Sequence, residues 1–469
     1  MLDNVARMKE FVERYVPEFM REGKIPGFSI AVVKEGEVVY TEGYGVRDLS
    51  RSIPSTPDTL YGIGSCTKSF VALAIMQLAE KGKLKLDDPV SEYVPLKIGV
   101  EGKPITIHHL LSHSSGIPSL ATSTISLWRS AGLDLGVPWG TVDDFYRFLN
   151  GAQDEVADEP GRKLFYFNAG YRLLGHIIQE RSGIPFHVYV TENILKPLGM
   201  TRTTLIKAEY ERDADRMTPY WKKPDGSLTP TPFPYPDVED NPSFSFIAAA
   251  GGIISPVKEL TNYLTATMDG GVHHGRRIAS LESIEKMTTP YINYTMTHYG
   301  RSGYGYGWSI VDDFLGNKMV SHGGSILVST AHLAYLPGPK IGVAMAANTS
   351  QLFFPMLAEG VLASLLGKDP KELPALRLRE HIRRLKGTYE VYKGLERVRV
   401  LNRGGTLYLE MKDPFTDGTL PLIPDGQSPI TTKYYTLVEG LRQPIEFIAY
   451  PDDRVDLFWE RYRYHKTKV

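Results

Sequence analysis

The apolar residues at the start of the chain recur with the period of an α-helix. They stand at Val5, Met8, Phe11, Val12, Tyr15 and Phe19. Because residues three and four apart lie on one side of a helix, these side chains would form a single apolar stripe. Gly23 and Gly27 follow and stop the pattern. The spacing therefore predicts an amphipathic helix over residues 3–22.

Two pairs of short apolar runs predict β-hairpins that are far apart in the sequence. Residues 28–33 and 38–41 flank a turn that contains glycine, and residues 331–336 and 341–346 flank a turn that contains two prolines. Strands would therefore lie at both ends of one large unit. This arrangement indicates an antiparallel sheet packed with helices, which is an α+β fold.

The middle of this unit carries helical patterns and one segment of a different kind. The helical patterns span residues 65–81, 106–111, 168–183, 186–195 and 257–269. Seven prolines occur between residues 219 and 242, where they block a helix and disfavour a strand. We expect a long ordered loop or a lid there, with a surface excursion of no function as the alternative.

The character of the sequence changes after about residue 366. Glycine and proline interrupt the chain, a basic helix is predicted over 376–386, and only short β-rich runs follow. These runs span residues 387–391, 397–401, 406–411, 434–438, 445–450 and 455–459. Their spacing suits a small antiparallel barrel. The predicted organisation is a domain over 1–370, a linker with a short helix over 371–386, and a barrel domain over 387–469.

Composition and charge exclude several classes of protein. The chain is 42% hydrophobic, and its 53 Lys and Arg residues balance 54 Asp and Glu residues. An ordinary apolar content excludes a mainly disordered chain, and a net charge of −1 gives no support for nucleic-acid binding. No stretch suggests export or a membrane span, so we expect a cytoplasmic protein. The single cysteine, Cys66, is expected to pack in the core.

A Ser-x-x-Lys motif opens the helix predicted over residues 65–81. Three residues of separation place Ser65 and Lys68 on one side of the helix. A serine hydroxyl is a weak nucleophile unless a neighbour takes its proton, and a desolvated lysine can do so. A Ser-x-x-Lys motif alone is more often part of an ordinary capped helix than of a catalytic site, so other residues must decide.

Two later segments could complete such a site. Tyr166 and Asn168 stand where a loop enters a predicted helix, so a phenolate near Lys68 could act as a general base and the amide could bind a substrate amide. At His322-Gly323-Gly324-Ser325 a strand ends in two glycines, which would let a substrate backbone approach closely.

Taken in order, the three segments resemble the motifs of the serine β-lactamase and penicillin-binding-protein superfamily. The motifs are Ser65-Cys66-Thr67-Lys68, Tyr166-Phe167-Asn168 and His322-Gly323-Gly324. Stretches similar to the CubicO-type branch lie at 105–116, 170–175, 196–200 and 249–252. The resemblance covers about residues 5 to 365. The tail from residue 385 is similar to the lipocalin-like barrel that follows this domain in some archaeal CubicO-type serine peptidases.

The resemblance implies a fold and a set of catalytic roles. The fold would be a β-lactamase-like antiparallel sheet flanked by helices, with an all-helical subregion, followed by a small lipocalin-like β-barrel. Ser65 would be the acylated nucleophile and Lys68 its proton partner. Tyr166 would be the base, and Asn168 would contact a substrate amide.

The third motif would bind substrate beside the nucleophile. The resemblance assigns the oxyanion hole to the backbone N–H groups of Ser65 and Ser325, and substrate contacts to His322, Gly323 and Gly324. Many relatives carry lysine where this chain has His322. A neutral imidazole would hold a substrate carboxylate less strongly than lysine does.

The leading hypothesis is a serine peptidase that cleaves peptides through an acyl-enzyme, with a preference for D-residues as in several relatives. An esterase or a β-lactam-hydrolysing enzyme would use the same residues. A ligand-binding protein on a retired enzyme scaffold is the third reading, with ligand held in a barrel lined by aromatic residues. These aromatic residues are Tyr389, Tyr408, Phe447, Phe458 and Trp459. A barrel packed with side chains is preferred over one with a ligand cavity.

The remaining expectations concern cofactors and partners. No cofactor and no metal is expected, because the spacing of His108, His109 and His113 does not match a His-Glu-x-x-His site. Neither a nucleic acid nor a membrane is expected as a partner. The resemblance to archaeal peptidases implies a homo-oligomer that self-compartmentalises and so restricts access to Ser65.

Overall fold

The computed structural model divides the chain into two compact units. They span Met1–Lys368 and Asp369–Val469. The described residues are 2–130, 132–236, 238, 247–351, 353–412 and 417–467. No helix within these ranges is both long and apolar enough to cross a membrane.

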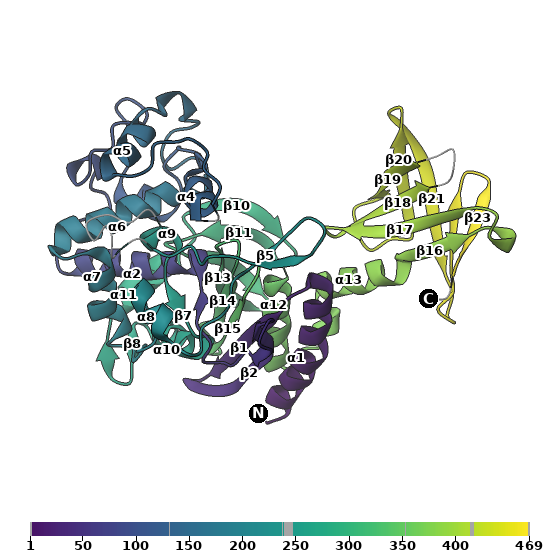
Figure 1. The fold of residues 1–469 in the computed structure, drawn as a ribbon, viewed down its shortest axis with the longest axis horizontal. Helices are drawn as coiled ribbons and strands as arrows, with labels where there is room; N and C mark the ends of the chain where they lie inside the picture. Colours follow the sequence, from purple (N-terminus) through teal and green to yellow (C-terminus); the bar gives the residue numbers. More distant parts are fainter. Residues whose placement is uncertain are drawn as a thin grey trace. The chain divides into compact units, whose positions relative to one another are not determined.

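The first unit is built on a nine-stranded antiparallel sheet (Figure 1). In spatial order the strands are β10 (Ile292–Thr297), β11 (Gly300–Tyr304), β12 (Ser309–Phe314), β13 (Asn317–Ser325), β14 (Thr330–Leu336), β15 (Ile341–Ala347), β1 (Gly27–Lys34), β2 (Glu37–Asp48) and β3 (Ile53–Pro54). Both predicted hairpins are present. They meet in the middle of the sheet, where β1 pairs with β15 from Phe28 opposite Ala347 to Lys34 opposite Ile341. The α+β expectation is therefore confirmed.

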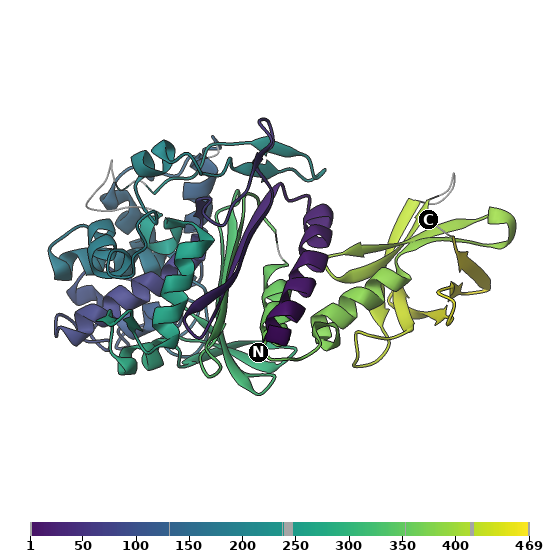
Figure 2. The same ribbon diagram turned by 90° about the horizontal axis from the view of Figure 1, so that it is seen from below.

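Helices cover both faces of the sheet, as Figure 2 shows. The predicted N-terminal helix, α1 (Leu2–Gly23), packs with α12 (Phe354–Leu365) on one face. A methyl group on Gly360 of α12 would lie 2.0 Å from the Phe11 ring, so the two helices touch closely. The opposite face holds α10 (Val257–Met268), which packs on β1 and β15, and the rest of the helical region.

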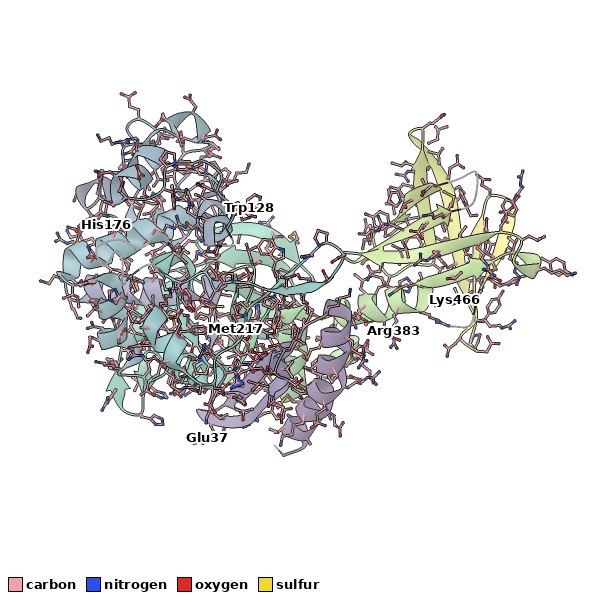
Figure 3. The ribbon with its side chains drawn as sticks, in the orientation of Figure 1. Glu37, Trp128, His176, Met217, Arg383 and Lys466 are labelled. Carbon is pink, nitrogen blue, oxygen red and sulfur yellow. The ribbon has the colours of Figure 1, made fainter. Side chains whose placement is uncertain are left out.

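The helical region contains the predicted helices and several more. Their bounds are α2 (Thr67–Glu80), α3 (Ile107–Leu111), α4 (Thr122–Ser130), α5 (Val142–Asn150), α6 (Asn168–Ser182), α7 (Phe186–Val190), α8 (Lys207–Arg212), α9 (Ala248–Gly251) and α11 (Leu281–Met287). A π-helical turn over Thr191–Leu195 extends α7. The Tyr146 hydroxyl lies 2.5 Å from Nδ1 of His176, labelled in Figure 3, and ties α5 to α6.

The proline-rich segment is not wholly a loop. The short strands β5 (Tyr220–Lys222) and β6 (Leu228–Pro230) pair with each other inside it. A two-stranded ribbon has two free edges, so a proline at the end of a strand costs no interior ladder hydrogen bond. The expectation of a loop without strands is therefore wrong for Tyr220–Lys222 and Leu228–Pro230. Residues 237 and 239–242 of the predicted lid lie outside the described residues.

The second unit is a closed antiparallel barrel, which confirms the predicted architecture. Its strands are β16 (Gly387–Glu390), β17 (Arg397–Arg403), β18 (Thr406–Lys412), β19 (Asp417–Pro424), β20 (Lys433–Val438), β21 (Leu441–Ala449), β22 (Val455–Trp459) and β23 (Tyr462–Lys466). Pairing of β16 with β23 closes it. The predicted basic helix, α13 (Pro374–Leu385), places Ile382 and Leu385 in the same apolar cluster as the barrel interior.

Alternation along the strands determines which aromatic residues of the barrel point into its interior. Tyr389 and Phe447 are buried in the interior cluster. Tyr408 is half-buried, because its neighbours Leu407 and Leu409 are the residues that point inward. Phe458 is likewise half-buried. Of the five aromatic residues that the ligand-binding alternative placed around a cavity, Tyr408 and Phe458 therefore lie outside the interior cluster.

Candidate active site

Ser65 lies in a tight turn that leads into the most buried helix of the first unit. Residues Gly64–Cys66 form a 3₁₀ turn, and α2 begins at Thr67. Gly64 has φ +53°, and a methyl group there would lie 2.5 Å from the Ser325 nitrogen. Only glycine fits both the backbone angle and the contact. The turn therefore holds Ser65 against the end of β13.

The Lys68 amine lies directly beside the Ser65 hydroxyl. Nζ of Lys68 is 3.0 Å from Oγ of Ser65 and 2.7 Å from the carbonyl oxygen of Ala250. The Lys68 side chain is fully buried. The structure thus brings together the serine and lysine that the motif predicted to be neighbours.

Burial and a nearby charge both act on Lys68. Loss of water lowers its pKa well below 10.5, and the positive charge of Arg172 on α6 lowers it further. Arg172 is itself buried, over the ring of Trp139 and with its Nη2 3.2 Å from Oγ of Ser126. The two causes favour an uncharged amine at Ser65.

Tyr166 is held over Lys68 by His113. The Tyr166 ring centroid lies 4.9 Å from Nζ of Lys68. The backbone N–H of Phe165 donates to the carbonyl oxygen of His113 at 2.8 Å, and that of Phe167 donates to Nδ1 of His113 at 3.1 Å. Burial lowers the pKa of His113 well below its usual value, which keeps the imidazole neutral and able to accept.

His113 is therefore a positioning residue that the sequence did not identify. Its contacts bracket Tyr166 on both sides, and the two rings lie 4.1 Å apart. The sequence feature that could have identified it is His113-Ser114-Ser115-Gly116, a stretch that resembles its counterpart in the CubicO-type branch. Nothing in the local pattern predicts that this stretch lies beside Tyr166, which is more than fifty residues away.

Asn168 is the first residue of α6 and lies in the same small cavity as Ser65. This cavity has a volume of about 50 Å³, and Ser325 and Arg172 also line it. A substrate amide bound there would meet the Asn168 amide and the Ser65 hydroxyl together. The structure thus brings Asn168, Ser65 and Ser325 to one place, as the motifs predicted.

Glycine lets the end of β13 contact the Gly64–Cys66 turn that contains Ser65. A methyl group on Gly324 would lie 1.9 Å from the carbonyl oxygen of Ile63 and 2.7 Å from the Ser65 nitrogen. Gly323 and Gly324 pair with His332 and Ala331 of β14. The absence of side chains at these glycines leaves the strand backbone against the site.

His322 is neutral and held on both ring nitrogens. Nδ1 lies 2.6 Å from the carbonyl oxygen of Gly323, and Nε2 lies 2.8 Å from the Tyr304 hydroxyl. Burial lowers its pKa to about 3. The Nδ1–H therefore donates to Gly323 while Nε2 accepts from Tyr304. An imidazole in this state supplies no positive charge to a substrate carboxylate.

The other sequence candidates have structural contacts. The Cys66 thiol is buried, donates to the carbonyl oxygen of His322 at 3.2 Å, and has its pKa raised to about 12 by burial. Nδ1 of His108 lies 2.7 Å from the Tyr306 hydroxyl. His109 accepts from the Thr106 N–H at the start of α3. In the described ranges, no three His, Cys, Asp or Glu side chains gather as a metal site requires.

A serine with a buried lysine amine 3.0 Å from its hydroxyl, beside an antiparallel sheet with helices on both faces, is the arrangement expected of the β-lactamase-like class of serine hydrolases. Comparison with protein families agrees. The family described as Beta-lactamase matches residues 12–365, and the chain belongs to this family. Residues 370–465 match the family described as Pab87 octamerisation domain.

Known proteins resemble the chain over different lengths. The structure of the octameric penicillin-binding protein homologue from Pyrococcus abyssi has a TM-score of 0.88 and 40% identity, and covers 97% of this chain and 99% of its own. A penicillin-binding protein from Bacillus halodurans has a TM-score of 0.59 and 25% identity over 76% of this chain and 99% of its own. Protein flp of Staphylococcus aureus is 28% identical over 74% of this chain. The match spans only 64% of protein flp.

Proposed function

We propose that the chain is a serine peptidase that acts on peptides through an acyl-enzyme on Ser65. The observation that carries the proposal is the Lys68 amine, 3.0 Å from the Ser65 hydroxyl and with a lowered pKa. An uncharged amine at that distance can take the hydroxyl proton as the oxygen attacks. The intact Ser65, Lys68, Tyr166 and Asn168 disfavour the reading as a retired scaffold that only binds ligand.

The proposed reaction has two balanced halves. Oγ of Ser65 bonds to the substrate carbonyl carbon while its proton passes to Lys68. The N–H groups of Ser65 and Ser325 stabilise the oxyanion. The C–N bond then breaks as the Tyr166 hydroxyl gives its proton to the departing amine and becomes a phenolate. Water attacks the acyl-enzyme while the phenolate takes a proton from it, and Lys68 returns its proton to Oγ of Ser65 as the acid leaves.

A matched substrate panel tests the substrate class. It contains L-residue and D-residue peptides, an aryl ester and a β-lactam, each assayed with wild type and with Ser65→Ala as background. We expect Ser65-dependent cleavage chiefly of peptides, with the D-residue members preferred. Turnover of only the ester or the lactam would preserve the mechanism and refute the peptidase assignment, because the same residues serve either leaving group.

We also infer that the chain assembles into a homo-oligomer that restricts access to Ser65. The octamerisation-domain match over residues 370–465 and the octameric Pyrococcus abyssi homologue support this. The hairpin of β20 and β21 also exposes apolar side chains, with Leu441 at 67%. Light scattering of the full chain should give an integral multiple of its 52.4 kDa mass. A monomer at working concentration would refute the assembly and the restricted access together.

A further inference from the structure

A second, larger cavity begins at the catalytic residues and ends at α12. Its volume is about 480 Å³, within the range of about 300 to 1,000 Å³ typical of small-molecule sites. Tyr166, His322 and Gly323 form part of its wall, and Glu359 on α12 forms another part. Strands β10 to β14 supply most of the remainder. A group that enters this cavity therefore stays in contact with the active site.

The walls of the cavity suit an apolar stem. The aliphatic part of the lining consists of Leu164, Val311, Met319, Ala334, Pro355 and Ala358. Tyr166, Tyr299 and Tyr304 add aromatic rings. Methylene groups can pack on the aliphatic residues, and the faces of aromatic rings attract cations. This combination is typical of sites for long side chains with a charged end.

The charge of the lining points to a cation. Among the described lining residues, Glu359 is the acidic group and neither lysine nor arginine occurs. His322 and His332 are neutral near pH 7, because burial lowers their pKa values to about 3 and about 4. An anion that entered would meet a carboxyl group with no compensating cation. A protonated amine would find its partner.

Glu359 has no cationic partner among the residues that the structure describes. Its Oε2 accepts a hydrogen bond from the Tyr299 hydroxyl at 3.1 Å. Burial raises its pKa to about 7. An incoming ammonium group would stabilise the ionised form of this carboxyl group and form an ion pair with it.

Each of the two cavities suits one half of the substrate. Asn168 and Ser65 share the small cavity, which suits the acyl half with its amide. Tyr166 lines the larger cavity and would pass a proton to the departing amine. We propose that the larger cavity is the leaving-group subsite and that Glu359 selects a leaving group with a protonated amine on an apolar stem. The proposal rests on the proposed acyl-enzyme function.

A pair of substrates that differ in one charge tests the role of Glu359. Both carry the same acyl residue, and the scissile amide joins it to lysinamide in one and to norleucinamide in the other. Wild type should favour the lysine member at least about tenfold in kcat/KM, with most of the difference in KM, because a largely desolvated charge pair is being recognised. Glu359→Gln should bring the ratio close to one, and Glu359→Asp should retain part of the preference.

Matched controls separate recognition from structure. Glu282→Gln removes an exposed acid on α11 that lines neither cavity, and it should keep the wild-type ratio. Inhibition of wild type by lysinamide and norleucinamide needs no variant, and lysinamide should bind at least about tenfold more tightly. A wild-type ratio near one, equal inhibition by the two amides, or an unchanged ratio in a folded Glu359→Gln protein would each overturn the subsite.

Two further comparisons complete the test. Amides of 1,5-diaminopentane and pentylamine should show the same preference for the charged member. If the lysinamide substrate is cleaved faster than the diaminopentane amide, the natural leaving group is a peptide residue. If the diaminopentane amide is cleaved faster, the natural leaving group is a simple diamine. If no amide is cleaved, the peptidase proposal fails. Esters with aminoalkyl and alkyl leaving groups then test Glu359 separately. The ratio of their kcat/KM values is compared between wild type and Glu359→Gln.

Discussion

Ser65→Ala is expected to reduce kcat/KM by at least about 10³-fold for every substrate that wild type cleaves, since loss of a covalent nucleophile removes the reaction path itself. The change deletes one oxygen from a half-buried side chain and leaves the turn at Gly64 intact. The variant should therefore fold and bind substrate as wild type does. Steady-state assays on the substrate panel measure the loss.

Intact-mass measurement gives an independent test of the acyl-enzyme. A slowly hydrolysed substrate should add its acyl mass to wild type, with the adduct on the peptide that contains Ser65, and should leave Ser65→Ala unmodified. Ser91→Ala, which alters an exposed serine of the same unit, serves as the matched control and should keep wild-type activity and labelling. Full activity in Ser65→Ala would refute the nucleophile assignment.

The elements that the sequence predicted are those with a regular pattern of burial. Helix α1 buries Met8, Phe11 and Val12 on one side, and the hairpin strands β1, β14 and β15 are buried along nearly their whole length. In these segments the local pattern and the tertiary environment agree. The local sequence pattern alone was then sufficient to predict the central strands of the sheet and the amphipathic helix.

The missed elements lack such a pattern. Helix α12 is apolar on nearly every side because it packs on both α1 and the sheet, so it has no polar stripe to reveal it. Strand β19 contains two prolines, and β23 is dominated by basic and aromatic residues. Strand β12 includes adjacent acidic residues at Asp312 and Asp313. These segments become helix or strand through pairing with neighbours distant in the sequence.

The contrast between local pattern and tertiary packing also applies to the site residues. Ser65 and Lys68 are neighbours because three residues of separation suffice on a helical turn. The charge of Arg172 on Lys68, the bracket that His113 forms around Tyr166, and the acid at Glu359 all depend on which elements pack together. No spacing in the sequence carries that information, so the residues that tune the site emerge only from the fold.

Lys68→Met is expected to lower kcat/KM by about 10² to 10⁴-fold, the range for loss of a general base. Methionine is similarly long and unbranched, so it can fill the space among the buried neighbours of Lys68 while removing the amine 3.0 Å from Ser65. Steady-state kinetics should show the loss mainly in kcat. Unchanged kcat in a folded Lys68→Met protein would contradict the role of the amine.

The pH profile separates the chemical role of Lys68 from a merely structural one. Activity that needs the uncharged amine rises with pH through the lowered pKa of Lys68, so wild type should lose activity on the acidic side of that value. Arg172→Met removes the positive charge that helps to lower this pKa. The acidic limb of kcat/KM should therefore move to higher pH in Arg172→Met, whereas the low residual activity of Lys68→Met should lack the limb.

Thermal unfolding gives an independent test, because Lys68→Met should lose activity without losing stability. Folding buries the Lys68 amine and lowers its pKa below 10.5, so between this lowered pKa and 10.5 the unfolded chain binds more protons than the folded chain and wild type gains stability as the pH rises. Methionine avoids the burial of an ionisable group. Lys68→Met should thus have a Tm equal to or above that of wild type near pH 7, with less gain at high pH. A lower Tm together with lost activity would show instead that Lys68 supports the fold.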